Sequence, residues 1–474
     1  MNSTFMAGAA QQVITPPLGL HLVGWSARAA GDSLARYVHD DLYVKAVVVE
    51  QGGQSGALIV ADLVGVDMVT AERIRRGIAA DTALDPATVL ICATHCHSGP
   101  AICPVAAAVN HSEIPAVQAD GTMQGAYGQA AASVASGAYY LGEADAAWKD
   151  FFVSQAIKAA VAAWQSRRAA EVAFAEAEVE GVASSRRVFL SDGSWADPRR
   201  ANPAAAAVVS RTEIDPHVRV MLVREAHSAA PLAMVMNYGC HPWVFSASAY
   251  SAEIPGAAAQ SIAATWCAPG GKPPIVLHTS GPAGDVTAIW NIDIENVWLS
   301  RPGESPADSL ARREKAFDSE IQRMSRRLVT GVEAAIGRAQ HWDAQPTLNI
   351  RRRRFALPLK PGYHRPPEVV LADWQMVAPE GQHLTEAHLL QLGAGAILAL
   401  PGELFVSLGR RLRDWAPVQH LLIATIASDY GPFNYLADAG DYELGGYELV
   451  LTPAAPEAGA ELVRQAARLF EGGA

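Results

Sequence analysis

The sequence is poor in cysteine and contains no long apolar run. Five cysteines in 474 residues are few, and their odd number argues against a framework of disulfides. No stretch of about 18 consecutive apolar residues is present, so the sequence predicts no membrane-spanning helix. The first residues, Met1–Gly8, have neither a basic region nor a long apolar segment, so no secretory signal is expected. From these absences we expect a cytoplasmic protein.

The sequence also has fewer basic than acidic residues. The 37 lysines and arginines are outnumbered by 48 acidic residues, which gives a net charge of −11 and argues against a nucleic-acid-binding surface. Charged residues make up 18% of the chain and hydrophobic residues 50%, so a substantial core can form. The length allows two or three average domains or one large α/β domain.

Short segments rich in Val, Ile and Leu recur along the chain, and they are often apolar at every position, which is typical of strands buried on both faces. We expect strands at Tyr43–Glu50, Ser55–Ala61, Thr88–Ala93, Val218–Arg224, Leu232–Tyr238, Pro274–His278, Ala396–Leu400 and His420–Ala424. Apolar residues at helical spacing predict helices at Val69–Ala80, Ala146–Arg168, Ser309–Ala339 and Leu404–Trp415. Strands alternating with helices predict an α/β fold of layered, mixed β-sheets flanked by helices.

Two further segments differ from the rest in composition. Ala101–Asp145 is rich in Ala, Gly and Ser, and a segment of this kind is uncommon in a compact domain unless it covers a site. The run Arg351–Arg354 predicts an edge strand whose alternating arginines form one solvated face.

Two histidines follow the strand expected at Thr88–Ala93. In an extended chain, residues two apart point the same way, so His95 and His97 are expected to face one site and Cys96 the opposite face. Neutral imidazole is the commonest metal ligand and a proton carrier near pH 7. Two surface histidines at a strand end would give the same pattern, so this motif does not decide the matter alone.

Polar residues follow several other predicted strands. The strand ends are Gly239–Pro242, Thr279–Thr287, Pro401–Glu403 and Ser428–Tyr435. In open α/β sheets, ligands bind at the carboxyl ends of the strands. Each segment alone could be a turn or a helix cap. Two histidines and a carboxylate from separate strands, however, make a zinc site with a position open for water.

Several blocks of the sequence resemble, in order, the neutral/alkaline ceramidase family, whose catalytic domain is zinc-dependent. The blocks are Val13–Pro17 with Gly24 and Trp25, Ala61–Leu63, Ala93–Pro100, Asn237–Pro242, Gly284–Thr287 and Pro401–Arg413. Cys96 stands where the family has threonine. The resemblance implies one catalytic domain over residues 1–474, with a lid or insertion at 101–145.

The resemblance also implies a ligand set. His95, His241 and Glu403 match the zinc ligands of the family, and a tyrosine completes the metal shell. An ungapped match places Phe433 at the tyrosine position, and phenylalanine cannot bind zinc. We therefore expect Tyr435 to be the fourth ligand, with Tyr430 as the second choice.

Further roles follow from the same resemblance. His97 matches a substrate-contacting or proton-handling histidine, Arg186 matches a position near the site, and Thr287 stands where the family has a functional serine. We expect His97, Arg186, Thr287 and Tyr435 to take part in catalysis.

Three departures from the family bear on the substrate. The secreted ceramidases carry a C-terminal immunoglobulin-like domain, whereas this sequence ends soon after the tyrosine block. No signal peptide is expected, and Thr287 replaces the serine without a following proline. We therefore expect a substrate smaller than ceramide, such as a small or medium N-acyl amide or a related cyclic amide or lactone.

Taken together, these features predict a zinc-dependent hydrolase that cleaves an amide, or a related acyl or lactone bond, with a metal-activated water. Its partner is a small acyl-amide or lipid-like substrate. Two other interpretations stay open. One is a metal hydrolase of the amidohydrolase barrel type, which would need eight βα units. The other is a non-catalytic protein with a structural zinc, which would normally have four Cys or His ligands.

Overall fold

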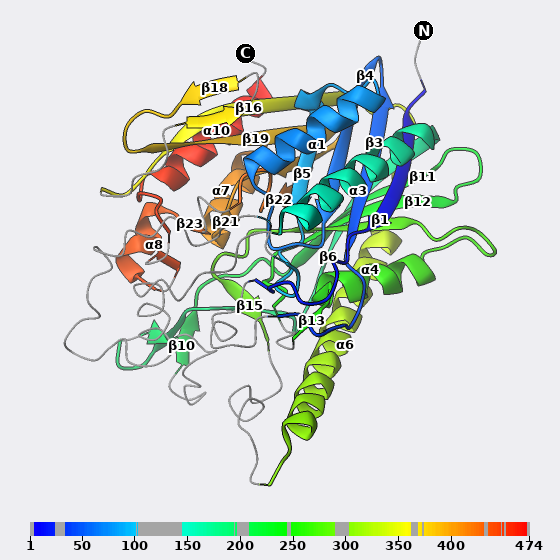
Figure 1. The fold of residues 1–474 in the computed structure, drawn as a ribbon. Helices are drawn as coiled ribbons and strands as arrows, with labels where there is room; N and C mark the ends of the chain where they lie inside the picture. The colour runs from blue at the N-terminus through cyan, green and yellow to red at the C-terminus, as the bar shows by residue number, and fades with distance from the viewer. Residues whose placement is uncertain are drawn as a thin grey trace.

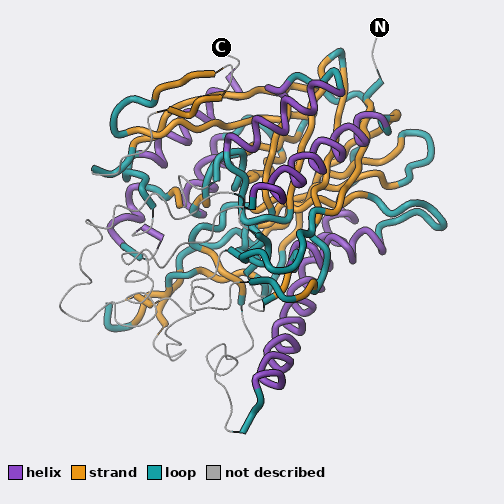
Figure 2. Tube along the Cα trace, in the orientation of Figure 1, coloured by secondary structure: helices purple, strands orange, loops and turns teal. Residues whose placement is uncertain are grey.

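The computed structural model describes the chain except for residues 1–3, 24–33, 101, 103–144, 194, 197–207, 244–247, 290–302, 362–367, 372–373, 431–434, 447, 450–451 and 472–474. The described residues form two principal β-sheets with helices on their outer sides (Figure 1), and Figure 2 shows the same layers by secondary structure. The predicted class, layered mixed sheets flanked by helices, is confirmed. The predicted lid at 101–145 lies outside the described residues apart from Ile102 and Asp145.

The larger sheet has eight strands in the order β14-β12-β11-β6-β1-β3-β4-β5. They are β1 (Met6–Val13), β3 (Tyr43–Gln51), β4 (Gln54–Ala61), β5 (Val89–Ala93), β6 (Arg168–Glu178), β11 (His217–Glu225), β12 (Pro231–Tyr238) and β14 (Ile275–Ser280). Neighbours pair antiparallel, except that β12 pairs parallel with β14 and β4 with β5. β14 also contacts β3, β4 and β5, so the sheet curls until its two edges approach each other. This mainly antiparallel sheet excludes, for the described residues, a barrel of eight parallel βα units.

A second sheet packs against the first. Its strands are β16 (Leu348–Pro358), β19 (Gln382–Leu392), β20 (Gly395–Ala399) and β22 (His420–Ala424), in that order, and only β20 and β22 pair parallel. β22 contacts β11, β12 and β14, while β20 contacts β5. The core between the sheets takes side chains such as Val47, Leu58 and Met221 from the first sheet and Ile397 and Leu422 from the second.

Helices cover the outer faces of both sheets (Figure 1). α1 (Met68–Asp81), α3 (Ala146–Gln165), α4 (Glu253–Thr265) and α6 (Pro306–Arg338) pack on the first sheet, and α7 (Val406–Trp415) and α10 (Ala458–Glu471) pack on the second. Along β3, Val44, Ala46 and Val48 face the helices, whereas Val47 and Val49 face the second sheet. Because successive side chains of a strand point to opposite faces, a strand buried on both faces is apolar at every position.

Most of the elements expected from the sequence are present at nearly the expected bounds. His420–Ala424 is β22 itself, and Ser55–Ala61 lies within β4. The helix predicted at Ala146–Arg168 ends at Gln165, because β6 begins at Arg168 and pairs first with β1 and then, from Ala170 to Glu178, with β11.

The arginine run forms part of β16, which is an edge strand of the second sheet as predicted. The expectation that alternate arginines form a solvated face is wrong. Arg352 and Arg354 turn towards the buried carboxylate of Glu386, with closest contacts of 2.5 and 3.4 Å. The other two arginines of the run donate hydrogen bonds to α10.

Among the described helices, none combines the length and the apolar character needed to cross a bilayer.

Candidate metal centre

His95 lies just beyond the end of β5, where the chain leaves the extended conformation. Its φ is +65°, in the left-handed region that residues other than glycine seldom adopt. A hydrogen bond of 3.1 Å from the Cys96 backbone N to the Leu63 carbonyl fixes the turn. The sequence predicted that His95 and His97 face one site because they alternate along an extended strand, and that reason is wrong. The turn nevertheless brings the two ring centroids within 4.6 Å of each other.

His241 follows β12, which lies next to β14, the edge strand opposite β5, and it approaches the same place as His95. Gly239 passes so close to the chain after β14 that a Cβ at this position would lie 2.6 Å from the Pro282 carbonyl oxygen. The glycine therefore allows the ends of two parallel strands to stay together. The His241 Nδ1 lies 2.8 Å from the Ala283 carbonyl oxygen and 3.1 Å from that of Val286, so the loop after β14 fixes the imidazole.

Glu403 places a carboxylate between the two imidazoles. It begins β21 (Glu403–Leu404) directly after Gly402, whose φ is +69°. Its Oε2 lies 2.9 Å from His241 Nε2 and 3.4 Å from His95 Nε2, and the two nitrogens are 3.1 Å apart. All three side chains are buried. Ligands bound at about 2.0–2.1 Å from a tetrahedral zinc lie about 3.3 Å from one another, so these three atoms have the spacing of a coordination shell.

In both imidazoles the Nδ1 nitrogen, which faces away from Glu403, lies within hydrogen-bond distance of a backbone carbonyl oxygen. His95 Nδ1 lies 2.9 Å from the Val64 carbonyl oxygen, and His241 Nδ1 faces two carbonyl oxygens. A carbonyl oxygen only accepts hydrogen bonds, so both Nδ1 atoms donate, and each neutral ring then presents a lone pair on Nε2. Two imidazole nitrogens and one carboxylate oxygen converge on one point, where a metal ion or a shared proton can be held. The same anchoring through the second ring nitrogen is usual for metal-ligating histidines.

Burial and nearby charges favour the same protonation state. Burial, and then the Arg186 guanidinium, lower the pKa of His241 from 6.5 to about 3. Burial acts to raise the pKa of Glu403, but the neighbouring His95 and His241 hold it well below its ordinary value. At neutral pH the site therefore has a neutral His241 and an ionised Glu403, the forms that bind a metal ion.

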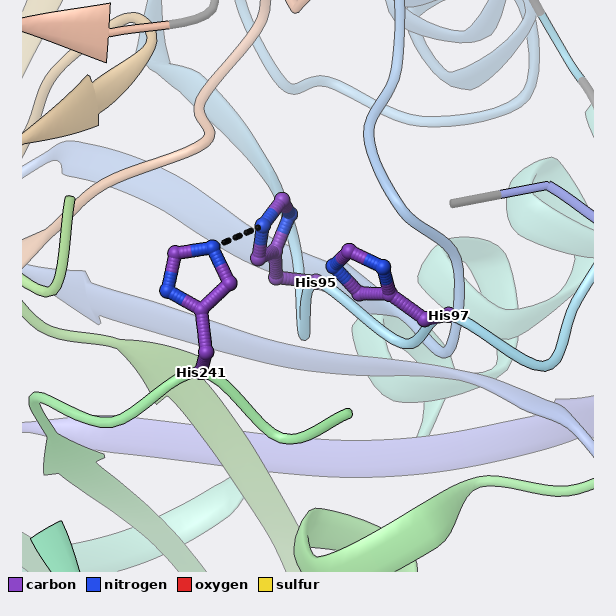
Figure 3. Close-up of side chains that lie close together, drawn as sticks. All are labelled: His95, His97 and His241. Carbon is purple, nitrogen blue, oxygen red and sulfur yellow. Dashed lines mark hydrogen bonds between the residues drawn. The ribbon is translucent and has the colours of Figure 1, made fainter. Parts of the chain in front are cut away.

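His97 is the third histidine of the cluster. Figure 3 shows its ring beside those of His95 and His241, and the ligating nitrogens of the three all lie within 4.8 Å of one another. Its backbone N donates a 3.0 Å hydrogen bond to Glu253 Oε2. The Glu403 carboxylate lies closer to His95 and His241 than the limit of 4.8 Å that groups His97 with them, so His95, His241 and Glu403 form a tighter set of three than the three histidines. His97 then lies at the border of the site, within reach of a molecule bound there.

Tyr435 is the strand partner of Glu403. β21 pairs parallel with β23 (Tyr435–Leu436), and Glu403 is in register with Tyr435. The Arg186 Cζ lies 6.0 Å from the centre of the Tyr435 ring, and its Nη1 donates to the carbonyl of Gly284 (2.9 Å) and to Glu448 Oε1 (3.1 Å). Burial and then the charge of Glu403 raise the pKa of Tyr435 well above 10.0. Tyr435 is therefore a neutral phenol beside the carboxylate, with a guanidinium next to it.

Tyr430 contacts Glu403 directly. Its hydroxyl donates a 3.1 Å hydrogen bond to Glu403 Oε1, which leaves Oε2 for the two histidines. Its ring packs on Gly65, where a Cβ would lie 2.1 Å from the ring carbons. The two tyrosines named from the sequence thus flank one ligand in different ways. Phe433, the ungapped match, lies outside the described residues.

Thr287 lies next to the loop that fixes His241. It belongs to β15 (Val286–Ala288), which pairs antiparallel with β7 (Ala183–Ser185), and Thr287 is in register with Ser184. Its side chain is buried, and its hydroxyl has no hydrogen-bond partner among the described residues. The structure therefore places Thr287 beside the site, with a hydroxyl still able to bond.

One buried acid of the site was not predicted from the sequence. Glu253 begins α4 with a φ of +52° and is 1% exposed. Its carboxylate accepts hydrogen bonds from the His97 backbone N and from the Ser98 hydroxyl (3.0 Å each). The only signal in the sequence is an acid before an apolar helix, which the helix dipole explains equally well.

No protein-family model and no curated protein matches this sequence. Solved structures of ceramidases do match. One is the neutral ceramidase from Pseudomonas aeruginosa, with a TM-score of 0.69 and 16% sequence identity over 99% of this chain and 75% of that one. Another is a ceramidase complexed with C2, with a TM-score of 0.69, 14% identity and the same two coverages. The resemblance noted in the sequence is confirmed at the level of the fold, and the chain has the fold of neutral ceramidase.

Proposed function

We propose that the protein is a zinc-dependent hydrolase that cleaves an amide, or a related acyl or lactone bond. The observation that carries the proposal is the buried triad of His95 Nε2, His241 Nε2 and Glu403 Oε2, which are 2.9–3.4 Å apart, the spacing of ligands around one metal ion. The fold shared with neutral ceramidase supports a hydrolytic role for this triad.

Two imidazoles and one carboxylate are the donor set of many catalytic zinc sites, which keep a position open, whereas structural sites are normally closed by four Cys or His ligands. When bound, zinc lowers the pKa of a coordinated water towards about 7 and polarises the carbonyl of the substrate. The donor set therefore favours a catalytic centre over the structural zinc site considered above.

The residues around the triad supply the remaining functions. His97 has an imidazole at the border of the site and can deliver a proton to the leaving group. Tyr435, as a neutral phenol, can donate to the oxygen that becomes negative in the transition state, with the positive charge of Arg186 beside it. The buried hydroxyl of Thr287 can orient the substrate or the water.

For the substrate, we propose small or medium N-acyl amides, or cyclic amides and lactones, ahead of ceramide. The proposal rests on the composition of Ala101–Asp145, whose small residues directly follow the site in the sequence and could close over a compact ligand. Turnover of a short-chain acyl amide compared with that of a long-chain ceramide in detergent tests this ranking. Efficient hydrolysis of ceramide alone would overturn the ranking and leave the metal site in place.

The test of the metal site is zinc analysis together with hydrolysis of a panel of acyl amides. The wild-type protein is expected to bind one zinc per chain and to lose activity when treated with a chelator. His241→Ala should lose both zinc and activity, while His227→Ala, at an exposed turn, should keep both. Full zinc content and full activity in His241→Ala would contradict the proposed function.

A further inference from the structure

A second buried group of charged side chains is contributed by α1, β16 and β19. Arg75 and Glu386 are both 0% exposed, and Arg75 Nη2 lies 2.8 Å from Glu386 Oε1. Arg352 approaches the other oxygen of Glu386 at 2.5 Å and Glu72 at 3.1 Å. Charged side chains are rarely buried so completely unless they are paired, and here each carboxylate has arginine partners.

Arg75 also reaches beyond this group to the loop that follows β22. Its Nη2 donates a 2.7 Å hydrogen bond to the Ser428 hydroxyl, and its Nε donates a 3.0 Å bond to the carbonyl of Val89. Val89 begins β5, the strand that leads to His95. One guanidinium therefore ties the Ser428 loop to the strand that leads to a proposed ligand.

Ser428 is held in a conformation that serine seldom adopts. Its φ is +55°, and a left-handed backbone at a residue other than glycine costs about 1–3 kcal/mol. Its backbone N donates a 2.9 Å hydrogen bond to the carbonyl of Ile91. The loop keeps this conformation because bonds from β5 and from Arg75 together fix it.

Tyr430 follows Ser428 by two residues, so the backbone conformation of Ser428 affects the position of Tyr430. The Tyr430 backbone N donates to the Val66 carbonyl (3.0 Å), its ring packs against Gly65, and its hydroxyl reaches Glu403 Oε1 at 3.1 Å. The ring has little room on its Gly65 side, so a shift of the loop moves the hydroxyl relative to Glu403.

We propose that Arg75 is a positioning residue: through Ser428 it holds Tyr430 against Glu403, and so sets the orientation of the carboxylate and its affinity for the metal. This inference rests on the proposed function. It concerns an outer partner of the site, and such partners typically change metal affinity by about 10–100-fold.

The experiment measures the zinc dissociation constant of the metal-free protein by chelator competition, with Zn²⁺ alone as the probe. Ser428→Ala removes the hydroxyl that accepts the 2.7 Å hydrogen bond from Arg75 and donates a longer one, 3.4 Å, to the Ile91 carbonyl, and we expect about tenfold weaker binding. Arg354→Lys changes an arginine of the same charged group that contacts Glu72 and Glu386, and it should bind zinc as the wild type does. Urea unfolding of each variant checks that it is folded.

Combining Ser428→Ala with Tyr430→Phe distinguishes a positioning role of Arg75 from a merely structural one, because only a positioning role makes the two effects on zinc binding depend on each other. If Ser428 acts through Tyr430, the effects of the two substitutions should not add, because the residues are coupled. The double variant Ser428→Ala/Tyr430→Phe should then have a zinc dissociation constant at most about twofold higher than that of whichever single variant binds zinc more weakly. If the loss of zinc affinity in the double variant equals the product of the losses in the two single variants, the positioning role is overturned. Wild-type affinity in Ser428→Ala would overturn it as well. If the wild-type protein binds no zinc, the proposed function falls as well, so the two failures are distinguishable.

Discussion

Replacing Glu403 with glutamine tests the reasoning behind the metal centre most directly. Glu403 Oε2 lies 2.9 Å from His241 Nε2 and 3.4 Å from His95 Nε2. Glutamine has nearly the same shape, but its amide carries no charge. The substitution therefore keeps the shape of the side chain but removes the negative charge that pairs with His95 and His241 and that would bind the cation.

The magnitudes follow from burial and length. The ionised Glu403 is stabilised by His95 and His241, as its lowered pKa shows, and losing one partner of a buried polar network costs about 1–3 kcal/mol, so metal-free Glu403→Gln should be less stable than the metal-free wild type by that order. Zinc at 1,000 times its dissociation constant adds about 4 kcal/mol to the wild type. For 474 residues the unfolding entropy is about 1 kcal/mol/K, so the substitution should lower the melting temperature of the metal-free protein by about 1–3 °C, and zinc should raise that of the wild type by about 4 °C.

Thermal unfolding with chelator and then with added zinc measures both effects. The wild type should gain stability from zinc, and Glu403→Gln should gain little. Glu213→Gln, at an exposed position, serves as the matched control and should respond to zinc as the wild type does. An equal gain from zinc in Glu403→Gln, or a metal-free variant more stable than the metal-free wild type, would refute the reasoning.

Three other predictions concern the surroundings of the site. Tyr430→Phe should mainly weaken zinc binding and Tyr435→Phe should mainly lower turnover at saturating zinc, as chelator competition and steady-state kinetics would show; the reverse pattern would exchange the two roles. Burial, and then Lys45, lower the pKa of His278 from 6.5 to about 3, so the unfolded chain binds an extra proton as the pH falls from 6.5 to 3. The wild type should lose up to about 5 kcal/mol over this range, and His278→Gln should lose correspondingly less in urea unfolding at several pH values. Burial raises the pKa of Asp285 from 3.8 to about 6, so this group opposes stability as the pH rises through that window. Asp285→Asn, measured without metal, should gain up to about 3 kcal/mol on the wild type at pH 8 and nothing below pH 4, and a constant difference would contradict the assignment.

The buried strands could be predicted from the sequence because two packed faces leave no room for polar residues. β22 is the clearest case, since His420–Ala424 is apolar after its first residue and has turns on both sides. β6 could not be separated from the preceding helix. Its alanine-rich sequence suits either state, and pairing with β11 decides between them, a contact that local periodicity does not contain.

The candidate ligands could be named from strand ends and from the resemblance, but their geometry could not. The left-handed turn at His95 depends on the backbone of the neighbouring β4–α1 connection, to which His95 Nδ1 also bonds at Val64. The choice between Tyr430 and Tyr435 stayed open for a similar reason. One tyrosine reaches Glu403 through a hydrogen bond and the other through strand register, and spacing along the chain distinguishes neither.

The buried charges around Arg75 were hidden for a further reason: their members are far apart in the sequence, and Arg75 alone looks like the solvated side of an amphipathic helix. Removing charges from water is costly, and well-packed apolar residues would often give equal or greater stability. Stability alone therefore explains this group poorly. What apolar residues could not supply is a directed hydrogen bond to Ser428, at a point where the backbone is strained and only two residues before a tyrosine that holds Glu403. The energetic cost of the cluster and its hydrogen bond to Ser428 together favour a role in placing that tyrosine.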